Sequence, residues 1–195
     1  MAIKRFNFFA MISRMKLINR WGLMRNTQSE NIQEHSLQVA IIAHALAMIK
    51  NEFFDGNVDT DKIAVFAMFH DANEILTGDL PTPIKYYNPE ISKAYKDVEY
   101  VSKAKLLSML PDKLKEKYSE IFYLDEETVE YKIVKAADRL SAYIKCVEEV
   151  KAGNNEFKKA GESILESINA IEMPEVKYFQ EHFIQGFFLS LDELN

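Results

Sequence analysis

An apolar helical run ends abruptly in three ionisable side chains within the stretch Phe66-Ala67-Met68-Phe69-His70-Asp71-Ala72-Asn73-Glu74. Apolar residues three, four and seven positions before His70 have the spacing of a helix face directed at a core, so we expect the histidine to lie on that face. Asp71 follows directly and Glu74 comes one helical turn later, so a single face can present all three groups. The stretch therefore predicts a metal site beside an acid/base group. The alternative is a core histidine hydrogen-bonded to its neighbour, because a His-Asp pair alone does not distinguish the two.

Length and composition favour one helical domain over residues 1–195. Apolar residues make up 48% of the chain, which has only 6 glycines and 5 prolines, and this suits a single globular domain with a substantial core. No run of about 18 uncharged apolar residues is present, so we expect no membrane-spanning helix and no membrane partner. Strand-like alternation and internal repeats are also missing from the sequence. The predicted fold class is all-α.

Charge and cysteine content limit the classes of binding partner and the cellular compartment that we expect for this chain. Lys and Arg number 24 and Asp and Glu number 30, for a formal net charge of -6. This balance disfavours binding to a nucleic-acid polymer, which needs a concentrated basic surface. A small phosphorylated substrate stays open, because a bound divalent cation would supply local positive charge. The single cysteine, Cys146, has no partner for an internal disulfide, so the cytoplasm is the expected compartment.

Capping and turn residues place the expected helices. Asp59 or Thr60 should cap the helix that leads to His70, and Asn88-Pro89 should begin another. One glycine and two prolines are expected to keep residues 75–85 out of regular structure, either as a stiff loop that walls a pocket or as a plain connection. The other helices are expected over residues 5–18, 32–51, 88–110, 111–122, 125–152 and 155–171, and after Pro174.

The helix expected over residues 32–51 carries two histidines. His35 and His44 are nine residues apart, and nine steps of about 100° place them on opposite sides of a helix, so they cannot share a site. His35 follows a polar turn and has polar neighbours, which favours it as the functional histidine. We interpret His44 as structural, and also His182. The apolar stripe of this helix is expected at Leu37, Ala40, Ile41, Ala45 and Met48.

Arg20 and Trp21 stand next to each other, just before a glycine. A guanidinium can grip a phosphate with two hydrogen bonds, and the ring of the only tryptophan can shape a pocket. The alternative is a buried tryptophan beside a surface arginine.

Asp138 lies close to an apolar stripe on the helix expected over residues 125–152. The stripe consists of Ile133, Ala136, Ala137, Leu140, Tyr143, Ile144 and Val147. A carboxylate near such a stripe is costly unless it is paired or bound to a metal. Pairing with Lys135 or Arg139 is the alternative to a metal ligand.

Three helices thus offer His35, then His70-Asp71, then Asp138. This order on separate helices of an all-α chain resembles the HD-domain metal-dependent phosphohydrolases. Within them, the chain is most similar to the family of bacterial 5'-deoxynucleotidases, over essentially its whole length. The segments that carry the resemblance are Lys16–Trp21, Glu34–Ala40, His70–Glu74, Leu76–Pro83 and Ala152–Phe157.

The resemblance implies a single HD domain, a homodimer, and a phosphatase that takes the 5'-phosphate from deoxyribonucleoside monophosphates. It implies that the metal ligands are His35, His70, Asp71 and Asp138. It implies that the acid/base carboxylates are Glu74 and Asp79. The substrate contacts that it implies are Arg20, Trp21, His35, Asp71, Asp79, Leu80, Pro81, Thr82 and Asp138.

The candidate side chains themselves point to the same chemistry. Two imidazoles and two carboxylates suit one divalent transition-metal ion (Co, Mn, Zn, Ni or Fe) better than they suit a closed thiolate zinc centre. Such an ion lowers the pKa of bound water to about 7 and neutralises phosphate charge. Glu74 is then expected to orient the water or exchange a proton with it, and Asp79 to assist the leaving group.

Two other functions stay open at this stage. HD proteins also act on nucleoside triphosphates and other nucleotides, and an HD-like helical scaffold can bind a nucleotide or a protein without turnover. The Arg20-Trp21 pair and the loop over residues 77–83 favour a monophosphate substrate. The presence of Glu74 and Asp79 favours an enzyme over a binding scaffold.

Overall fold

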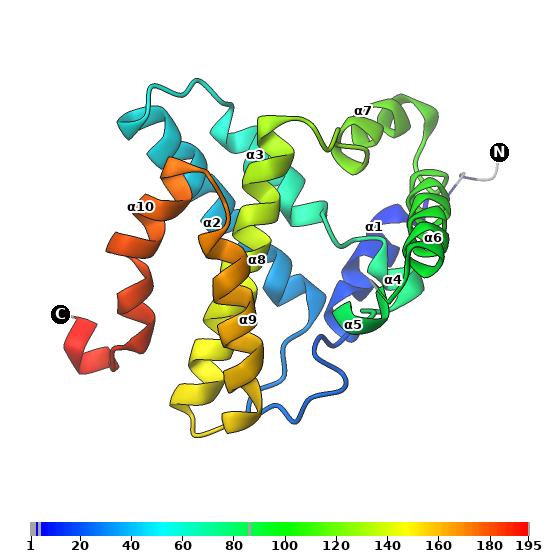
Figure 1. The fold of residues 1–195 in the computed structure, drawn as a ribbon. Coiled ribbons are helices and arrows are strands. Elements are labelled where there is room, and N and C mark those ends of the chain that lie inside the picture. The colour runs from blue at the N-terminus through cyan, green and yellow to red at the C-terminus, as the bar shows by residue number, and fades with distance from the viewer. Residues whose placement is uncertain (1–2, 4, 86, 195) are drawn as a thin grey trace. The chain divides into compact units, whose positions relative to one another are not determined.

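The computed structural model describes residues 3, 5–85 and 87–194, and within them every regular element is a helix (Figure 1). The all-α prediction is confirmed. The chain divides into two compact units, and that residues 1–195 act as one domain remains a prediction. The elements are α1 (Phe8–Ile12), η1 (Ser13–Leu17), α2 (Ile32–Phe53), α3 (Thr60–Phe69), α4 (Glu74–Thr77), α5 (Thr82–Lys85), α6 (Pro89–Leu107), α7 (Asp112–Phe122), α8 (Val129–Lys151), η2 (Asn155–Phe157), α9 (Lys158–Asn169), α10 (Pro174–His182), η3 (Ile184–Phe188) and η4 (Leu191–Leu194).

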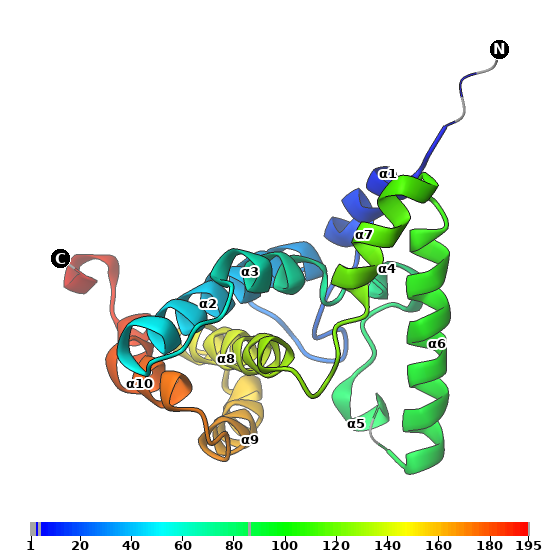
Figure 2. The ribbon, with the colours of Figure 1, turned by 90° about the horizontal axis from the view of Figure 1, so that it is seen from above.

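The first unit comprises residues 1–23, 29–36 and 69–124. Its long helix is α6, and Figure 2 shows α4 and α5 beside it. Phe8 is fully buried, and its ring packs against the ring of Tyr118, with centroids 5.0 Å apart. Burying such a side chain stabilises a fold by about 1.5–3 kcal/mol. The core residues of this unit are Phe8, Met15, Ile32, Ala72, Leu106, Leu107, Leu110 and Phe122.

The second unit comprises residues 24–28, 37–68 and 125–195 and is built on α8. Figure 1 shows α9 running alongside α8, and η2 and η3 also pack on it. The stripe predicted on α8 is buried except at Tyr143, which is half-buried. No helix in the described part of the chain is long and apolar enough to span a bilayer.

Two predicted helix caps are confirmed. The Asn88 side chain accepts a hydrogen bond from the Ile91 amide at 2.8 Å, and Asp59 accepts one from the Lys62 amide at 2.9 Å. A side-chain cap of this kind stabilises a helix by about 0.5–2 kcal/mol.

Several predicted boundaries are wrong, and one of them is the end of the helix expected to reach residue 110, because α6 ends at Leu107. The first helix begins at Phe8 and tightens into the 3-10 turn η1 at Ser13. The helix expected from residue 125 begins at Val129, because the Thr128 hydroxyl caps it by accepting from the Tyr131 amide. The helix expected over residues 155–171 is split into η2 and α9, which ends at Asn169.

Residues 75–85 differ from the prediction in part, because residues 75–77 belong to the short helix α4 and residues 82–85 form α5, whereas residues 78–81 are outside regular structure as expected. Gly78 ends α4 with a φ of 73°, a left-handed conformation that glycine adopts without strain. Pro81 precedes α5, and its carbonyl accepts the Ile84 amide at 2.8 Å. Pro83 lies in the first turn of α5, where amides have no partner within the helix, so neither proline removes a helical hydrogen bond.

The face of α2 expected to be apolar and buried is largely exposed. Leu37, Ile41 and Met48 have exposed fractions of 57%, 62% and 42%, whereas Ala40 is buried as predicted. The buried side chains lie on another arc of the helix. Periodicity did not identify that arc because α2 is apolar around most of its circumference. The buried apolar residues are Ile32, Val39, Ala40, Ile42, Ala43, Leu46, Ala47 and Ile49.

A buried carboxylate, Glu149 on α8, holds the segment 24–28 within the second unit. It accepts hydrogen bonds from Lys145 Nζ at 2.5 Å, from the Thr27 amide and hydroxyl at 2.9 and 2.7 Å, from the Gln28 amide at 3.2 Å and from Asn154 Nδ2 at 2.8 Å. Burial raises the pKa of Glu149, but these donors outweigh burial and hold the pKa well below its ordinary value. The ionised form is therefore the stable one in the folded chain.

We expect Glu149→Gln to lower the free energy of unfolding by about 3–5 kcal/mol, because it leaves the Lys145 ammonium buried without its anion. The double variant Glu149→Gln, Lys145→Met no longer buries an unpaired ammonium, so it should recover much of the lost free energy of unfolding. The folded pKa lies below the ordinary value of 4.5, so the contribution of Glu149 is fully present above that pH. It should shrink as the pH falls below 4.5.

Urea denaturation at pH 7 and at pH 4 measures these differences. Glu162→Gln, an exposed change on α9, is the charge-matched control. A loss no greater than the control's would contradict the assigned role of Glu149.

Candidate functional site

His35 and His70 come together in the first unit. His35 lies in the first two turns of α2 and is fully buried. His70 directly follows the last residue of α3. The two ring centroids are 5.3 Å apart and the ring planes are inclined at 55°. The sequence interpretation that paired His35 with His70 thus matches their placement.

The expectation that one helical face presents His70, Asp71 and Glu74 is wrong. Helix α3 ends at Phe69, and Glu74 begins the separate helix α4. Between them the chain turns, with the Ala72 amide donating to the Phe69 carbonyl at 3.1 Å. The stretch contains no glycine or proline to mark this stop, so the helical spacing extended past the true end of the helix.

Asp71 approaches both histidines with the same carboxylate oxygen. Its Oδ2 lies 3.6 Å from His35 Nε2 and 3.2 Å from His70 Nε2. Asp71 is about one-fifth exposed, whereas the two imidazoles are almost entirely buried. One carboxylate and two imidazole nitrogens therefore face one another.

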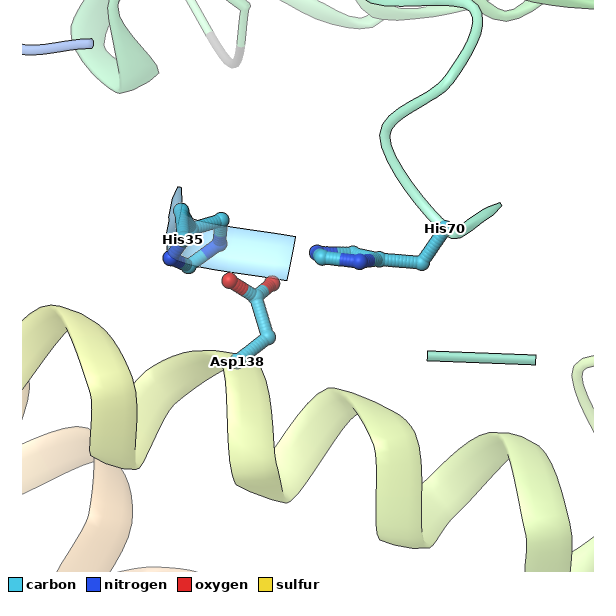
Figure 3. Close-up of side chains that lie close together, drawn as sticks. All are labelled: His35, His70 and Asp138. Atoms are coloured by element: carbon cyan, nitrogen blue, oxygen red, sulfur yellow. The ribbon is translucent and has the colours of Figure 1, made fainter. Parts of the chain in front are cut away.

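A group of possible metal ligands consists of His35, His70 and Asp138 (Figure 3). Each offers one ligand atom, and these atoms lie within 4.8 Å of one another. Metal–nitrogen bonds are about 2.0–2.1 Å long, so ligands on opposite sides of one ion lie about 4 Å apart. The donor set and its spacing fit one divalent ion after small adjustments. Among the described residues, this group does not include Asp71.

Asp138 also forms the ion pair that the sequence offered as the alternative to a metal. Its Oδ2 lies 2.8 Å from Lys135 Nζ, on the same face of α8. The Lys135 side chain is 42% exposed, and an exposed pair of this kind contributes about 0–1 kcal/mol. Such a weak pair does not prevent Asp138 from turning a carboxylate oxygen to a cation.

Glu74 and Asp79 are carboxylates with raised pKa values. Burial, reinforced by the negative charges of Asp71 and Asp79, raises the pKa of Glu74 to about 10. Glu74 is 7% exposed, and its Oε2 accepts no hydrogen bond from the described part of the chain. Burial also raises the pKa of Asp79, against the opposing effects of the Arg20 guanidinium and the Trp21 amide. Carboxylates with raised pKa values beside potential metal ligands are typical of acid/base sites.

Arg20 and Trp21 are held next to Asp79. The backbone amide of Trp21 donates to Asp79 Oδ2 at 3.1 Å, although the two residues are 58 positions apart in the sequence. The Arg20 guanidinium carbon lies 5.8 Å from the centroid of the Trp21 ring. The structure thus brings the predicted phosphate-gripping pair to a predicted acid/base carboxylate.

Glu30 contacts both members of this pair and was missed in the sequence. Its Oε2 accepts from Arg20 Nη1 at 2.5 Å and from Trp21 Nε1 at 3.3 Å. Glu30 stood in a polar turn with no motif of its own, and only the pairing of residues 18–20 with 30–32 would have indicated its place.

The remaining predicted contacts lie in the segment after Gly78. Leu80 and Pro81 are half-buried. The backbone of Thr82 begins α5, and its side chain lies outside the described residues.

The other two histidines are separate from His35 and His70. His44 is 44% exposed and lies 3.8 Å from Asp61, and the ring of His182 packs on Tyr178 at 4.3 Å. Both placements agree with the structural interpretation of these residues.

Comparison with known proteins gives one consistent family. A family profile described as 5'-deoxynucleotidase YfbR-like matches residues 7–187. A 5'-deoxynucleotidase of Photobacterium profundum is 50% identical, over 99% of this chain and 100% of its own. The 5'-deoxynucleotidase YfbR of an Escherichia coli O127:H6 strain is 51% identical, over 99% of this chain and 98% of its own.

A solved structure extends the similarity to three dimensions. The crystal structure of an HD-domain phosphohydrolase from Listeria innocua matches with a TM-score of 0.81 at 25% identity, covering 95% of this chain and 90% of the other. The fold expected from the order of His, His-Asp and Asp is therefore confirmed.

Proposed function

This chain belongs to the 5'-deoxynucleotidase YfbR-like family and is an HD-domain hydrolase, and from that premise we propose how its residues act. The reaction is hydrolysis of a deoxyribonucleoside 5'-monophosphate to a deoxyribonucleoside and phosphate. The observation that carries the assignment of residues is the hydrogen bond from the Trp21 amide to Asp79. This hydrogen bond holds Arg20 and Trp21, which are suited to binding a phosphate ester, beside Asp79, which is suited to proton transfer.

A divalent metal ion is proposed to be held by His35, His70, Asp71 and Asp138. The spacing of three of these side chains supports the assignment, and so does the approach of Asp71 to both imidazoles. The nitrogen and oxygen donors suit Co, Mn, Zn, Ni or Fe. When bound, such an ion supplies Lewis acidity that neutralises phosphate charge and lowers the pKa of water.

Arg20 and Trp21 are proposed to orient the substrate. The guanidinium of Arg20 binds phosphate oxygens through paired N–H groups, and the Trp21 ring packs against the nucleoside. The segment from Asp79 to Thr82 is proposed to form further substrate contacts. The full proposed set is Arg20, Trp21, His35, Asp71, Asp79, Leu80, Pro81, Thr82 and Asp138.

Glu74 and Asp79 are proposed to move the protons. An oxygen–phosphorus bond forms to the attacking water, whose proton passes to Glu74, while the bond from phosphorus to O5' breaks and O5' takes a proton from Asp79. A base must be ionised to accept a proton, and a nearby divalent cation would favour the ionised form of Glu74 over the protonated one. Asp79, with a raised pKa, is suited to deliver a proton.

We further propose that the protein is a cytoplasmic homodimer that binds neither membranes nor nucleic-acid polymers. The apolar side chains of Leu37, Ile41 and Met48 on α2 are exposed, and exposed apolar side chains on one helix support a protein partner. The acidic net charge of -6 opposes polyanion binding. Cys146 is the single cysteine of the sequence, so the chain has no second cysteine for an internal disulfide, which agrees with a reducing compartment.

Purified protein should release inorganic phosphate from dAMP in the presence of Mn²⁺ or Co²⁺, faster than from AMP, and should release none from dATP. A malachite-green assay of the three nucleotides measures this. Phosphate release from dATP would favour a triphosphate hydrolase, which is the second enzymatic possibility. Binding of dAMP without release from any of the three would favour a non-catalytic nucleotide-binding scaffold.

Glu74→Ala should lower kcat for dAMP by about 10²–10⁴-fold, the usual contribution of a general acid or base, and leave metal bound. Steady-state kinetics and elemental analysis of the purified variant measure both effects. Glu116→Ala, an exposed change on α7, is the control for lost charge. Loss of the metal from Glu74→Ala would make Glu74 a ligand instead.

Asp138→Asn should weaken Co²⁺ binding by more than about 100-fold, the upper range for residues that only support a ligand. Lys135→Met removes the competing ion pair and should leave Co²⁺ affinity equal or higher. Titration calorimetry and the visible absorption of bound Co²⁺ report the affinity without any need for activity. His44→Ala serves as the control histidine change, and an unaltered affinity in Asp138→Asn would remove Asp138 from the site.

A further inference from the structure

One carboxylate, that of Glu30, contacts both side chains assigned to orient the substrate. Its Oε2 accepts a hydrogen bond from Arg20 Nη1 at 2.5 Å and another from Trp21 Nε1 at 3.3 Å. Both bonds converge on a single oxygen atom. The orientation of the guanidinium and the orientation of the indole are therefore linked through Glu30.

The backbone fixes where this carboxylate stands. The Arg20 amide donates to the Glu30 carbonyl at 2.9 Å, and the Ile32 amide donates to the Ile18 carbonyl at 2.9 Å. Asn19 and Asn31 form an antiparallel bridge between these two bonds. Glu30 and Arg20 thus face each other across a short antiparallel ribbon, and Glu30 contacts Arg20 through both its main chain and its side chain.

Trp21 has a backbone conformation that needs such support. Its φ is 59°, in the left-handed region, which costs a bulky residue about 1–3 kcal/mol and persists only where the surrounding structure holds the residue there. Asp79 accepts its amide hydrogen and Glu30 accepts its indole hydrogen. Two carboxylates therefore secure Trp21 at its main chain and at the far end of its side chain.

Burial makes the contact with Arg20 effective. The side chains of Arg20 and Glu30 are only 12% and 13% exposed, so water screens their attraction less than it would on an open surface. A guanidinium is a planar fork of donors, and a partner on Nη1 fixes the direction of the others. Holding that fork before the substrate arrives removes a cost of ordering it during binding.

We propose that Glu30 is a positioning residue that sets the guanidinium of Arg20 and the ring of Trp21 for the substrate. It acts through these two residues and does not itself contact the reacting atoms. The inference rests on the roles proposed above for Arg20 and Trp21. A misplacement of about 1 Å in a site can cost about 10²-fold in rate, so the contribution of Glu30 should be measurable.

Glu30→Ala should lower kcat/KM for dAMP by about 10- to 100-fold, with KM raised and kcat lowered. Glu30→Gln keeps an oxygen for the indole N–H but loses the charge that faces Arg20, so its effect should be smaller. In an Arg20→Ala background, Glu30→Gln should change kcat/KM by less than about twofold, because its partner is already gone. Glu116→Gln, exposed and on α7 of the same unit, is the charge-matched control.

The fluorescence of Trp21, the only tryptophan in the chain, provides a readout that does not depend on catalysis. In substrate-free protein, Glu30→Ala should increase acrylamide quenching of Trp21 and lower its anisotropy. Glu30→Gln and the control should stay close to wild type. This result, together with the kinetic loss and with thermal unfolding within a few degrees of wild type, would support the positioning role.

Unchanged kinetics and unchanged fluorescence in Glu30→Ala would overturn the inference. It would also fail if Glu30→Gln lost activity equally in the presence and absence of Arg20. A wild-type protein that releases no phosphate from dAMP would instead count against the proposed function, while the fluorescence comparison would still test the hold of Glu30 on Trp21. If Glu30→Ala does not fold, Glu30→Gln provides the same kinetic comparison, alone and combined with Arg20→Ala.

Discussion

Removing a carboxylate from water is costly unless hydrogen-bond donors replace the solvent, and both compact units of this chain are arranged around that constraint. In the second unit, Glu149 has donors from Lys145, Asn154 and the segment 24–28, and its pKa is lowered. In the first unit, Glu74 is nearly as buried, yet one of its oxygens has no donor in the described chain and its pKa is raised. The satisfied carboxylate has a structural role, and the unsatisfied one is the carboxylate for which we propose a catalytic role.

The first unit also uses acidic side chains to gather nitrogen donors from distant segments. Asp71 faces two imidazoles, Asp79 accepts the Trp21 amide, and Glu30 accepts from both Arg20 and Trp21. The segments around residues 20, 30, 70 and 79 are thereby joined through polar contacts rather than through apolar packing alone. Polar networks of this kind specify geometry more narrowly than an apolar core does.

Features that depend on neighbouring residues could be predicted from the sequence, whereas features that depend on tertiary packing could not. Asp59 and Asn88 were recognised because a cap depends only on the next few residues. Helix geometry showed that His35 and His44 cannot share a site, and the polar turn before His35 favoured it as the functional histidine. The end of α3 at Phe69 and the buried arc of α2 were missed, because each depends on which surfaces meet. Glu30 was missed for the same reason, since its partners lie ten and nine residues away across a ribbon.

The left-handed backbone at Trp21 has an evolutionary consequence. Glycine would occupy this conformation without strain, and a glycine does follow, at position 22, where the chain does not need it for this purpose. The strain of about 1–3 kcal/mol is an appreciable part of the 5–15 kcal/mol that keeps a typical domain folded. Selection for thermostability alone would therefore favour glycine at position 21, and the role proposed for Trp21 in orienting the substrate gives a reason to keep the indole there.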